Sequence, residues 1–181
     1  MKKRTSTFQN PFFCAFLLTG LLLMLGLSAH AQVDRFVNPS GTCAGTPCYM
    51  TISAAVAAAA ANDVIEVEDG TYNENVTISQ ALTLQSANGR SVTTIVGSDS
   101  GPAGTILINS GTSGVTIDGF TIVGFDNVLN GAIEYAAVYL RGAVTNTTIK
   151  NNEIVANGEA GLLSEYNAAM RFCFSVYAFS S

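Results

Sequence analysis

The stretch VTIDGFTIVG, residues 115–124, recurs 32 residues later as TTIKNNEIVA, and a related LTLQSANG begins 33 residues before it. A fixed period of about 20–50 residues is typical of a solenoid, a propeller or another array. Propeller blades would need antiparallel strands joined by hairpins, whereas each copy here reads as strand, bend, strand, with Asn or Gly at the bend. The repeats therefore predict a parallel β-helix, in which each copy forms one corner of a coil.

Apolar residues stand two positions apart in the copies and in the short runs between them. Leu82 with Leu84 and Val115 with Ile117 are examples. Period two with β-branched residues predicts strands with one buried face. The expected fold class is all-β, a right-handed parallel β-helix that occupies residues 51–169.

The register of the copies places Gln85, Asp118 and Lys150 in one column, just after an inward residue. If these strands stack at about 4.8 Å, Asp118 and Lys150 form an exposed ion pair worth about 0–1 kcal/mol. The next position in each copy is small or polar, as sharp corners require (Ser86, Gly119, Asn151).

The stretch TISAAVAAAAA, residues 51–61, predicts a helix. Alanine has the highest helix propensity, and Ile52 and Val56 share one apolar face. Because the open end of a solenoid exposes backbone and core, we expect this helix to cap the N-terminal coil. The alternative is an ordinary surface helix at the start of an α/β domain.

Residues 1–31 predict a signal peptide. Three basic residues at 2–4 precede an apolar stretch at 12–27, and the small residues Ala29 and Ala31 on either side of His30 predict cleavage before Gln32. A membrane anchor is the alternative, because the apolar stretch is nearly long enough to span a bilayer. We expect a protein that is secreted, extracellular or at the cell surface, with the periplasm as the alternative, and that does not insert into a membrane after cleavage.

Cleavage would leave five basic residues against thirteen acidic ones, a formal charge of −8. Such an acidic surface disfavours binding to nucleic acid or to anionic membranes. The single histidine, His30, leaves with the signal peptide. Its loss excludes Ser-His and Cys-His nucleophilic pairs and imidazole metal sites.

The lead at 32–50 is rich in turn residues and holds Cys43 and Cys48 on either side of AGTP. In an oxidising compartment this spacing predicts a small disulfide loop, and two free thiols are the alternative. Without further ligands, the two cysteines make a poor zinc site.

The stretch TISAAVAAAAANDVIEVEDGTYNENVTISQALTLQSANG, residues 51–89, resembles the N-terminal cap and first coils of the pectin lyase-like superfamily. VTIDGFTI and TTIKNNEI resemble its generic repeats, which NosD-like proteins also contain. The resemblance covers residues 51–163 and implies a right-handed parallel β-helix. It implies no single activity, because lyases, hydrolases, esterases and non-enzymatic surface proteins share this fold.

The superfamily's local catalytic signatures are absent from residues 51–163. They are the acidic calcium cluster of pectate lyases, the three aspartates of polygalacturonases, and the paired aspartates with an arginine of pectin methylesterases. No catalytic residue is therefore transferred from the resemblance.

The tail MRFCFSVYAFSS, residues 170–181, has no Asn or Gly corner and contains Cys173. We interpret it as the mark of a truncated or frameshifted chain, whose uncapped last coil would self-associate. The alternative is a genuine strand that pairs with the last coil.

Acidic residues on or beside the repeats, with two nearby bases, are the catalytic candidates (Asp118, Asp126, Glu134, Glu153, Arg141, Lys150). A pair of carboxylates could act on a glycosidic bond or hold Ca²⁺, which binds oxygen ligands. A lyase would use Arg141 or Lys150 as its base. No spacing singles out a pair, and a solvated turn acid is the alternative for each residue. No metal site and no cofactor is predicted, and Ca²⁺ is the ion that acidic coils would suit.

The insertion FDNVLNGAIEYAA, residues 125–137, offers aromatic rings that could stack on sugars and polar groups that could bind their hydroxyls. Its candidate ligand-binding residues are Phe125, Asp126, Asn127, Asn130 and Tyr135. An ordinary solvated loop is the alternative.

These observations favour a secreted, non-catalytic β-helix module that binds polysaccharide or presents an adhesive surface on the cell. The alternative is the N-terminal fragment of a polysaccharide lyase or glycoside hydrolase that acts on pectin-like polymers. Extracellular polysaccharide is the expected partner in both cases.

Overall fold

The structure is a computed structural model that describes residues 31–98, 104–125, 136–155, 160–164 and 170–173. Residues 32–181 group into one compact unit. Residues 1–30 lie outside the described ranges, so the signal peptide remains a prediction. Within those ranges, no helix is long and apolar enough to cross a membrane.

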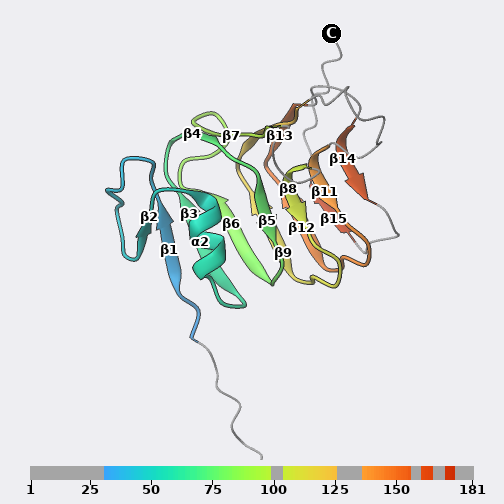
Figure 1. Ribbon diagram of the computed structural model, residues 1–181, viewed down its shortest axis with the longest axis horizontal. Helices are drawn as coiled ribbons and strands as arrows, with labels where there is room; N and C mark the ends of the chain where they lie inside the picture. Colours follow the sequence, from blue (N-terminus) through green and yellow to red (C-terminus); the bar gives the residue numbers. More distant parts are fainter. Residues whose placement is uncertain (1–30, 99–103, 126–135, 156–159, 165–169, 174–181) are drawn as a thin grey trace, which may run out of the picture. The chain divides into compact units, whose positions relative to one another are not determined.

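Three sheets, A, B and C, form the unit, and every pairing between described strands is parallel (Figure 1). Sheet A runs, from edge to edge, through β15 (Met170–Cys173), β12 (Thr147–Lys150), β9 (Val115–Asp118), β6 (Leu82–Ser86), β3 (Asp63–Val67), β1 (Asp34–Val37) and β2 (Cys48–Tyr49). Sheet B runs through β13 (Glu153–Val155), β10 (Thr121–Val123), β7 (Thr93–Val96) and β4 (Gly70–Asn73). Sheet C runs through β14 (Ala160–Ser164), β11 (Ala136–Leu140), β8 (Gly104–Ile108) and β5 (Val76–Ile78).

Each coil passes from sheet A to sheet B to sheet C and then returns to sheet A one strand further on. The coils are β3-β4-β5, β6-β7-β8, β9-β10-β11 and β12-β13-β14, followed by β15. The register pairs Leu82 with Val115 and Ile117 with Ile149, as the repeats predicted. The predicted parallel β-helix is therefore confirmed.

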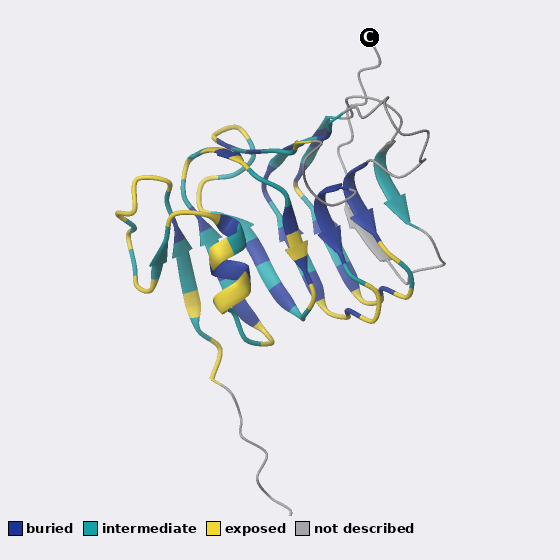
Figure 2. Cartoon of the chain, viewed as in Figure 1, coloured by how far each residue is buried: buried dark blue, intermediate teal, exposed yellow. Residues whose placement is uncertain are grey.

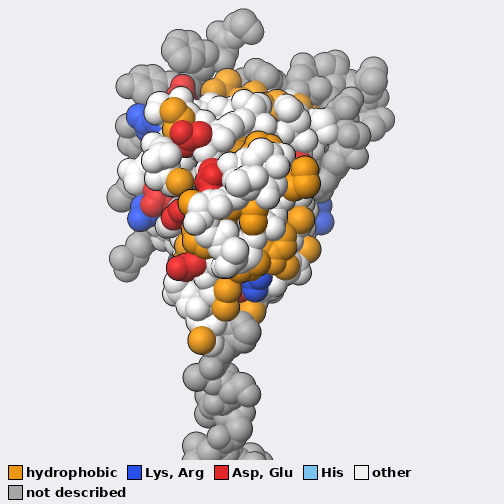
Figure 3. All heavy atoms as spheres, turned by 90° about the vertical axis from the view of Figure 1, so that its left-hand side faces the viewer, with side chains coloured by type: hydrophobic (Ala, Val, Ile, Leu, Met, Phe, Trp, Pro, Cys, Tyr) orange, Lys and Arg blue, Asp and Glu red, His pale blue; other side chains and the backbone are white. Residues whose placement is uncertain are grey.

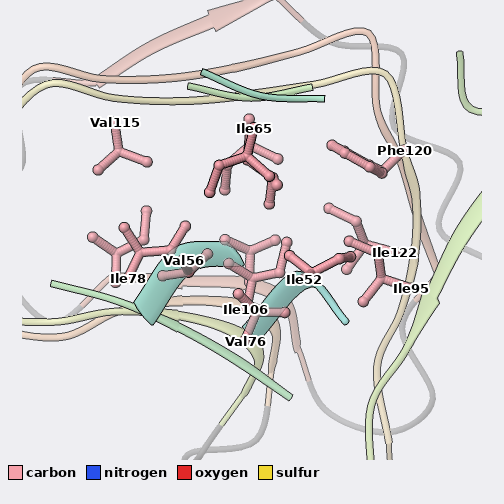
Figure 4. Packing of buried hydrophobic residues seen from close by; sticks show 14 of the residues in the cluster. Ile52, Val56, Ile65, Val76, Ile78, Ile95, Ile106, Val115, Phe120 and Ile122 are labelled. Carbon is pink, nitrogen blue, oxygen red and sulfur yellow. The ribbon is translucent and has the colours of Figure 1, made fainter. Parts of the chain in front are cut away.

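The core is the interior of the coils, where side chains of successive strands stack in columns. Ile65, Leu84, Ile117 and Ile149 form one column in sheet A, and all four are fully buried. Burial alternates along many of the strands in Figure 2, and the labelled side chains in Figure 4 meet across the interior from different sheets. Burying one such side chain contributes about 1.5–3 kcal/mol, so the columns stabilise the stacking of the coils.

Sheet C departs from the predicted alternation, because all five residues of β8 and of β11 are buried. Leu107, Ala136 and Tyr139 form a second apolar cluster. Leu107 stands between two residues of the main core, so this cluster lies on the outer face of sheet C. A pattern of one buried face therefore describes sheets A and B better than sheet C.

The helix α2 (Ile52–Ala58) covers the N-terminal end of the interior, and its buried residues belong to the main core (Figures 1 and 4). The Thr51 hydroxyl accepts a hydrogen bond from the Ala54 N–H at 3.2 Å. The Glu74 carboxylate accepts two more, from the N–H groups of Ile52 and Ser53, at 2.8 and 2.9 Å. These bonds satisfy amide groups that the first turn of a helix leaves unpaired.

The helix is three residues shorter at its C-terminal end than the predicted 51–61. Ala59 is already extended, and its carbonyl accepts a hydrogen bond from the Gln80 side chain at 2.6 Å. The buried Asp63 carboxylate accepts one from the Ala60 N–H at 2.8 Å. These two side-chain contacts outweigh the helix propensity of the last alanines.

The lead at 32–50 holds more structure than its turn residues suggested, because β1 and β2 extend sheet A beyond the first full coil. Phe36 pairs with Cys48 in this extension. A disulfide joins Cys43 to Cys48, with their Cα atoms 5.6 Å apart. Figure 3 looks onto this end of the unit, where acidic side chains gather on one side.

The corner between sheets A and B is two residues long in the third and fourth coils, Gly119-Phe120 and Asn151-Asn152. The side chain of Asn152 is buried, and its Oδ1 accepts from the Phe120 N–H at 2.8 Å. Its Nδ2 donates to the Ile117 carbonyl at 2.9 Å. This asparagine therefore satisfies backbone groups that a sharp bend would leave unpaired.

The strand pattern continues past residue 169, where the sequence placed the end of the β-helix. Met170–Cys173 forms β15 and pairs in parallel with β12. The alternative interpretation, a strand that pairs with the last coil, therefore agrees with the structure of these four residues. Residues 174–181 lie outside the described ranges, so a truncated chain and self-association through its last coil remain predictions.

Replacing Thr147 by valine is expected to raise the free energy of unfolding by about 1 kcal/mol. Among the described residues, the Thr147 hydroxyl is the buried side-chain group that has no hydrogen-bond partner. The previous coil has Val115 at the equivalent position, so the shape fits. Denaturant unfolding measures the change, and outward-facing Thr148→Val is the control, expected within 0.5 kcal/mol of the parent. A loss of stability in Thr147→Val would show that the hydroxyl is bonded.

Candidate functional site

A polar groove of about 540 Å³ lies at the corner where sheet A turns into sheet B. Its lining comes from the second, third and fourth coils (Gln85, Ser86, Gly89, Arg90, Asp118, Gly119, Asn151). The second coil has a corner of six residues, 87–92, where the third and fourth coils have two. The longer corner brings Arg90 to a groove that the other two coils alone would not form.

Asp118 is the acidic residue of this groove, and its charge is paired. Its Oδ2 lies 3.1 Å from the Lys150 Nζ, and its Oδ1 accepts from the Asn151 Nδ2 at 2.8 Å. Asp118 and Lys150 are register partners, as the repeats predicted. The side chains are 24% and 41% exposed, so the ion pair is a surface pair worth about 0–1 kcal/mol.

Two glycines with left-handed backbone leave the floor of the groove open. Gly89 and Gly119 have φ of 91° and 81°. A Cβ on Gly119 would lie 3.5 Å from the Gly89 Cα and from the Ser86 Cβ. A side chain there would strain the turn and fill space against the opposite wall.

The other described candidates do not join Asp118 in this groove. Arg141 follows β11 in sheet C, and its guanidinium carbon lies 5.8 Å from the centre of the Tyr139 ring. Glu153 begins β13 in sheet B. Phe125 lies beside Gly97, where a Cβ would be 2.8 Å from the phenyl ring. These three residues therefore belong to other parts of the coils.

The remaining candidates lie outside the described residues, so their roles remain predictions (Asp126, Asn127, Asn130, Glu134, Tyr135). No three His, Cys, Asp or Glu side chains in the described part of the chain lie close enough together to hold a metal ion. The possible Ca²⁺ ion therefore remains a prediction.

Sequence reasoning identified Asp118 and Lys150 but missed Arg90 and the groove itself. The column of Ser86, Gly119 and Asn151 was recognised as a corner, which is where the groove lies. The signal that could have indicated the groove was the extra length of the corner at 87–92. The three sequence copies superimpose along their first strand and differ in length only after it, so their alignment did not draw attention to this corner.

A second hollow, of about 390 Å³, lies between α2 and β5 (Ser53, Val56, Ala57, Asn75, Thr77, Ser79, Gln80). Its two amide side chains already hold the backbone together. Asn75 donates to the Gly104 carbonyl at 3.0 Å, and Gln80 donates to the Ala59 carbonyl at 2.6 Å. These contacts fasten the cap to the coils, so the corner groove is the better candidate for a ligand.

No family model and no curated protein matches the sequence. Among solved structures, the chain resembles a pectin methylesterase in complex with hexasaccharide VII, at 19% identity and a TM-score of 0.53. It also resembles a mutant pectin methylesterase in complex with hexasaccharide IV, at 18% identity and a TM-score of 0.50. The chain has the pectin lyase-like fold.

The match covers 76% and 80% of this chain but 46% and 49% of these two structures. The chain thus spans about half the length of its structural neighbours. At this level of identity the likeness establishes the fold alone, which agrees with the resemblance noted in residues 51–163, and the activity has to be argued from the site.

Proposed function

We propose that this chain is a secreted β-helix module that binds extracellular polysaccharide without catalysing a reaction on it. The polar groove at the corner of sheets A and B is the observation that carries the proposal. Its side chains offer amide, hydroxyl, guanidinium and carboxylate groups. Groups of these kinds, placed in a concave surface, fix and orient a polar ligand.

Binding suits the groove better than catalysis. Asp118 is the one carboxylate that lines it, and that carboxylate is already held by Lys150 and Asn151. Glycosidic hydrolysis commonly uses two carboxyl groups about 5–10 Å apart, one of them protonated. A lyase needs a base free to take a proton, whereas Lys150 is engaged in the ion pair.

The charges around the groove favour a polysaccharide with some carboxylate groups. Arg90 and Lys150 place two positive charges near the single carboxylate of Asp118, although the chain as a whole is acidic. A guanidinium can bind a carboxylate through two parallel hydrogen bonds. The two pectin methylesterase structures hold hexasaccharides, which makes a galacturonan a suitable first probe.

Replacing Arg90 by glutamine is expected to weaken binding to polygalacturonate about tenfold, or about 1.4 kcal/mol. The substitution removes the guanidinium from the groove and leaves the strands intact. Calorimetric titration of the secreted chain measures the affinity. Arg141→Gln is the control with the same charge change, and its affinity should equal that of the parent, because Arg141 follows β11 of sheet C and does not line the groove.

Two results would contradict the proposed function. The first is the absence of saturable binding by the parent chain to polygalacturonate, pectin or neutral plant polysaccharides at millimolar concentrations of sugar. The second is an equal weakening of binding in Arg90→Gln and Arg141→Gln, which would indicate general charge attraction rather than a site.

A second candidate function is a part of an enzyme that acts on pectin-like polymers. It is favoured by the structural neighbours, which are pectin methylesterases about twice as long as the matched part. Incubation with pectin would test it through three products, namely methanol, new reducing ends and unsaturated uronates. Release of any of these by the purified chain would replace the non-catalytic proposal.

A further inference from the structure

The strand β4 is the N-terminal edge of sheet B, and one of its sides has no neighbouring strand. Sheet A continues past the first full coil through β1 and β2, whereas sheet B ends at β4. In sheet C the corresponding edge strand is β5, and α2 packs against it. Thr71 and Asn73 of β4 are exposed. At this end of the β-helix, β4 is therefore an edge that solvent can reach.

The pairing of β4 with β7 uses only alternate residues of β4. The N–H groups of Gly70 and Glu74 donate to carbonyl groups of the second coil at 3.0 and 3.1 Å. In a parallel pair, the residues between such bonded positions direct their backbone groups to the other side of the strand. Those residues are Thr71 and Asn73, and in the described part of the chain their backbone groups have no partner on that side. The edge thus offers two N–H donors and two carbonyl acceptors.

Three carboxylates flank this edge. Glu68 and Asp69 precede β4, and Glu74 follows it. Their hydrogen bonds come from neutral groups, such as the Asn88 amide that donates to Asp69 at 2.9 Å and the Ile52 N–H that donates to Glu74 at 2.8 Å. Neither of the ion pairs found among the described residues involves these acids. Their negative charge is therefore not neutralised by a protein cation.

The effect of these charges reaches the middle of the strand. Burial raises the pKa of the Tyr72 hydroxyl to about 12, and the negative charges of the same three acids contribute to the increase. The Tyr72 hydroxyl donates to the Glu68 carbonyl at 2.9 Å, so it lies on the side of the strand where two of the acids begin. The edge as a whole is therefore a region of negative potential.

We propose that β4 binds an extended, positively charged segment of another protein, which adds to sheet B as a further strand. Strand addition draws its affinity from backbone hydrogen bonds and its specificity from side chains on alternate residues. Thr71 and Asn73 would supply the backbone bonds, and lysine or arginine side chains of the partner would lie near the three acids. No residue of β4 lines the corner groove, so this interaction is separate from the proposed polysaccharide binding.

The charges favour a basic partner over a second copy of this chain. Two copies paired through β4 would bring both sets of carboxylates together, and the chain has thirteen acidic residues against eight basic ones. Charged side chains at an edge strand are a common means by which proteins prevent such self-pairing. A segment of opposite charge meets no repulsion of this kind, and it gains the unpaired backbone groups of the edge.

Hydrogen exchange measured by NMR on the full secreted chain tests the inference. The probe is a short synthetic peptide in which lysine and valine alternate, so that its charges lie on one face of the added strand. At saturating peptide, exchange of the Thr71 and Asn73 amides should slow about tenfold or more. The control is the same peptide with alternate backbone nitrogens methylated, which keeps the charges but cannot pair with the edge and should give no protection.

Two substitutions separate the charge from the backbone bonds. Asp69→Asn should weaken binding of the lysine–valine peptide about three- to fivefold at low salt, because it removes one charge and keeps an oxygen for the Asn88 amide. Glu153→Gln is the matched control, since it removes the same charge from β13 at the opposite edge of sheet B and should leave the affinity unchanged. Asn73→Pro removes an N–H on the free side of β4, which an edge strand tolerates, and should abolish the protection of the edge. Thermal unfolding should show that all three variants fold like the parent.

Three results would overturn the inference. Equal binding of the methylated and unmethylated peptides would show that charge alone attracts them. Absence of binding to either peptide would show that the acids serve only to keep the edge unpaired. Dimerisation of the parent in sedimentation, abolished by Asn73→Pro, would show that the edge binds a second copy rather than a basic partner.

Discussion

Replacing Asp63 by asparagine is expected to lower the free energy of unfolding by about 3–5 kcal/mol. The Asp63 side chain is fully buried, and its Oδ2 lies 2.8 Å from the Arg35 guanidinium. Its Oδ1 accepts from the Val33 N–H at 2.9 Å. An amide would turn a donor toward the Ala60 N–H and Arg35 and leave a mostly buried guanidinium without its counter-charge.

The pH dependence follows from the same contacts. Burial alone would raise the pKa of the Asp63 carboxyl, but hydrogen bonds from the N–H groups of Ala60 and Val33 and from Arg35 outweigh burial and lower it. A lowered pKa means that this stabilisation is complete above the usual aspartate pKa of about 3.9 and is lost as the pH falls through the folded value. The parent should therefore lose stability in acid more steeply than Asp63→Asn does.

Unfolding by guanidinium chloride at pH 7 and at pH 3 measures both the loss of stability in Asp63→Asn and its dependence on pH. Asp118→Asn is the matched control, because Asp118 is also paired with a cation but is partly exposed. Its cost should stay within about 1 kcal/mol. Equal costs for the two variants would contradict the argument that burial and backbone bonds set the strength of the Asp63 pair.

The same pair explains what the sequence could and could not predict at the N-terminal end. The alanine-rich helix was predicted because propensity is a local property. The bonds of Asp63 to Val33 and Arg35 were not predicted, because they join segments about 30 residues apart. Contacts of this kind have no local signature in a single sequence.

The repeats, by contrast, allowed a long-range prediction. A period of about one coil converts a distance along the chain into a register between strands, so the ion pair of Asp118 and Lys150 followed from counting alone. Arg90 did not follow, because the corner at 87–92 breaks the period. The candidate site thus lies where the repeat is interrupted, and there the sequence period no longer predicts which residues lie side by side.

Replacing Ile117 by alanine is expected to destabilise the protein by about 2–5 kcal/mol. Ile117 is fully buried at the centre of its column, between Leu84 and Ile149. The neighbouring side chains are held at the strand spacing by the backbone pairing of β6, β9 and β12. They cannot collapse into the cavity, so most of the cost of the missing atoms should remain.

The neighbouring residue supplies the control for this prediction. Thr116→Val changes an outward side chain on the same strand and should alter stability by no more than about 0.5 kcal/mol. Denaturant unfolding of both variants against the parent measures the difference. A small cost for Ile117→Ala would mean that the coils can close around a cavity, and the rigid register of the strands beside the corner groove would then need revision.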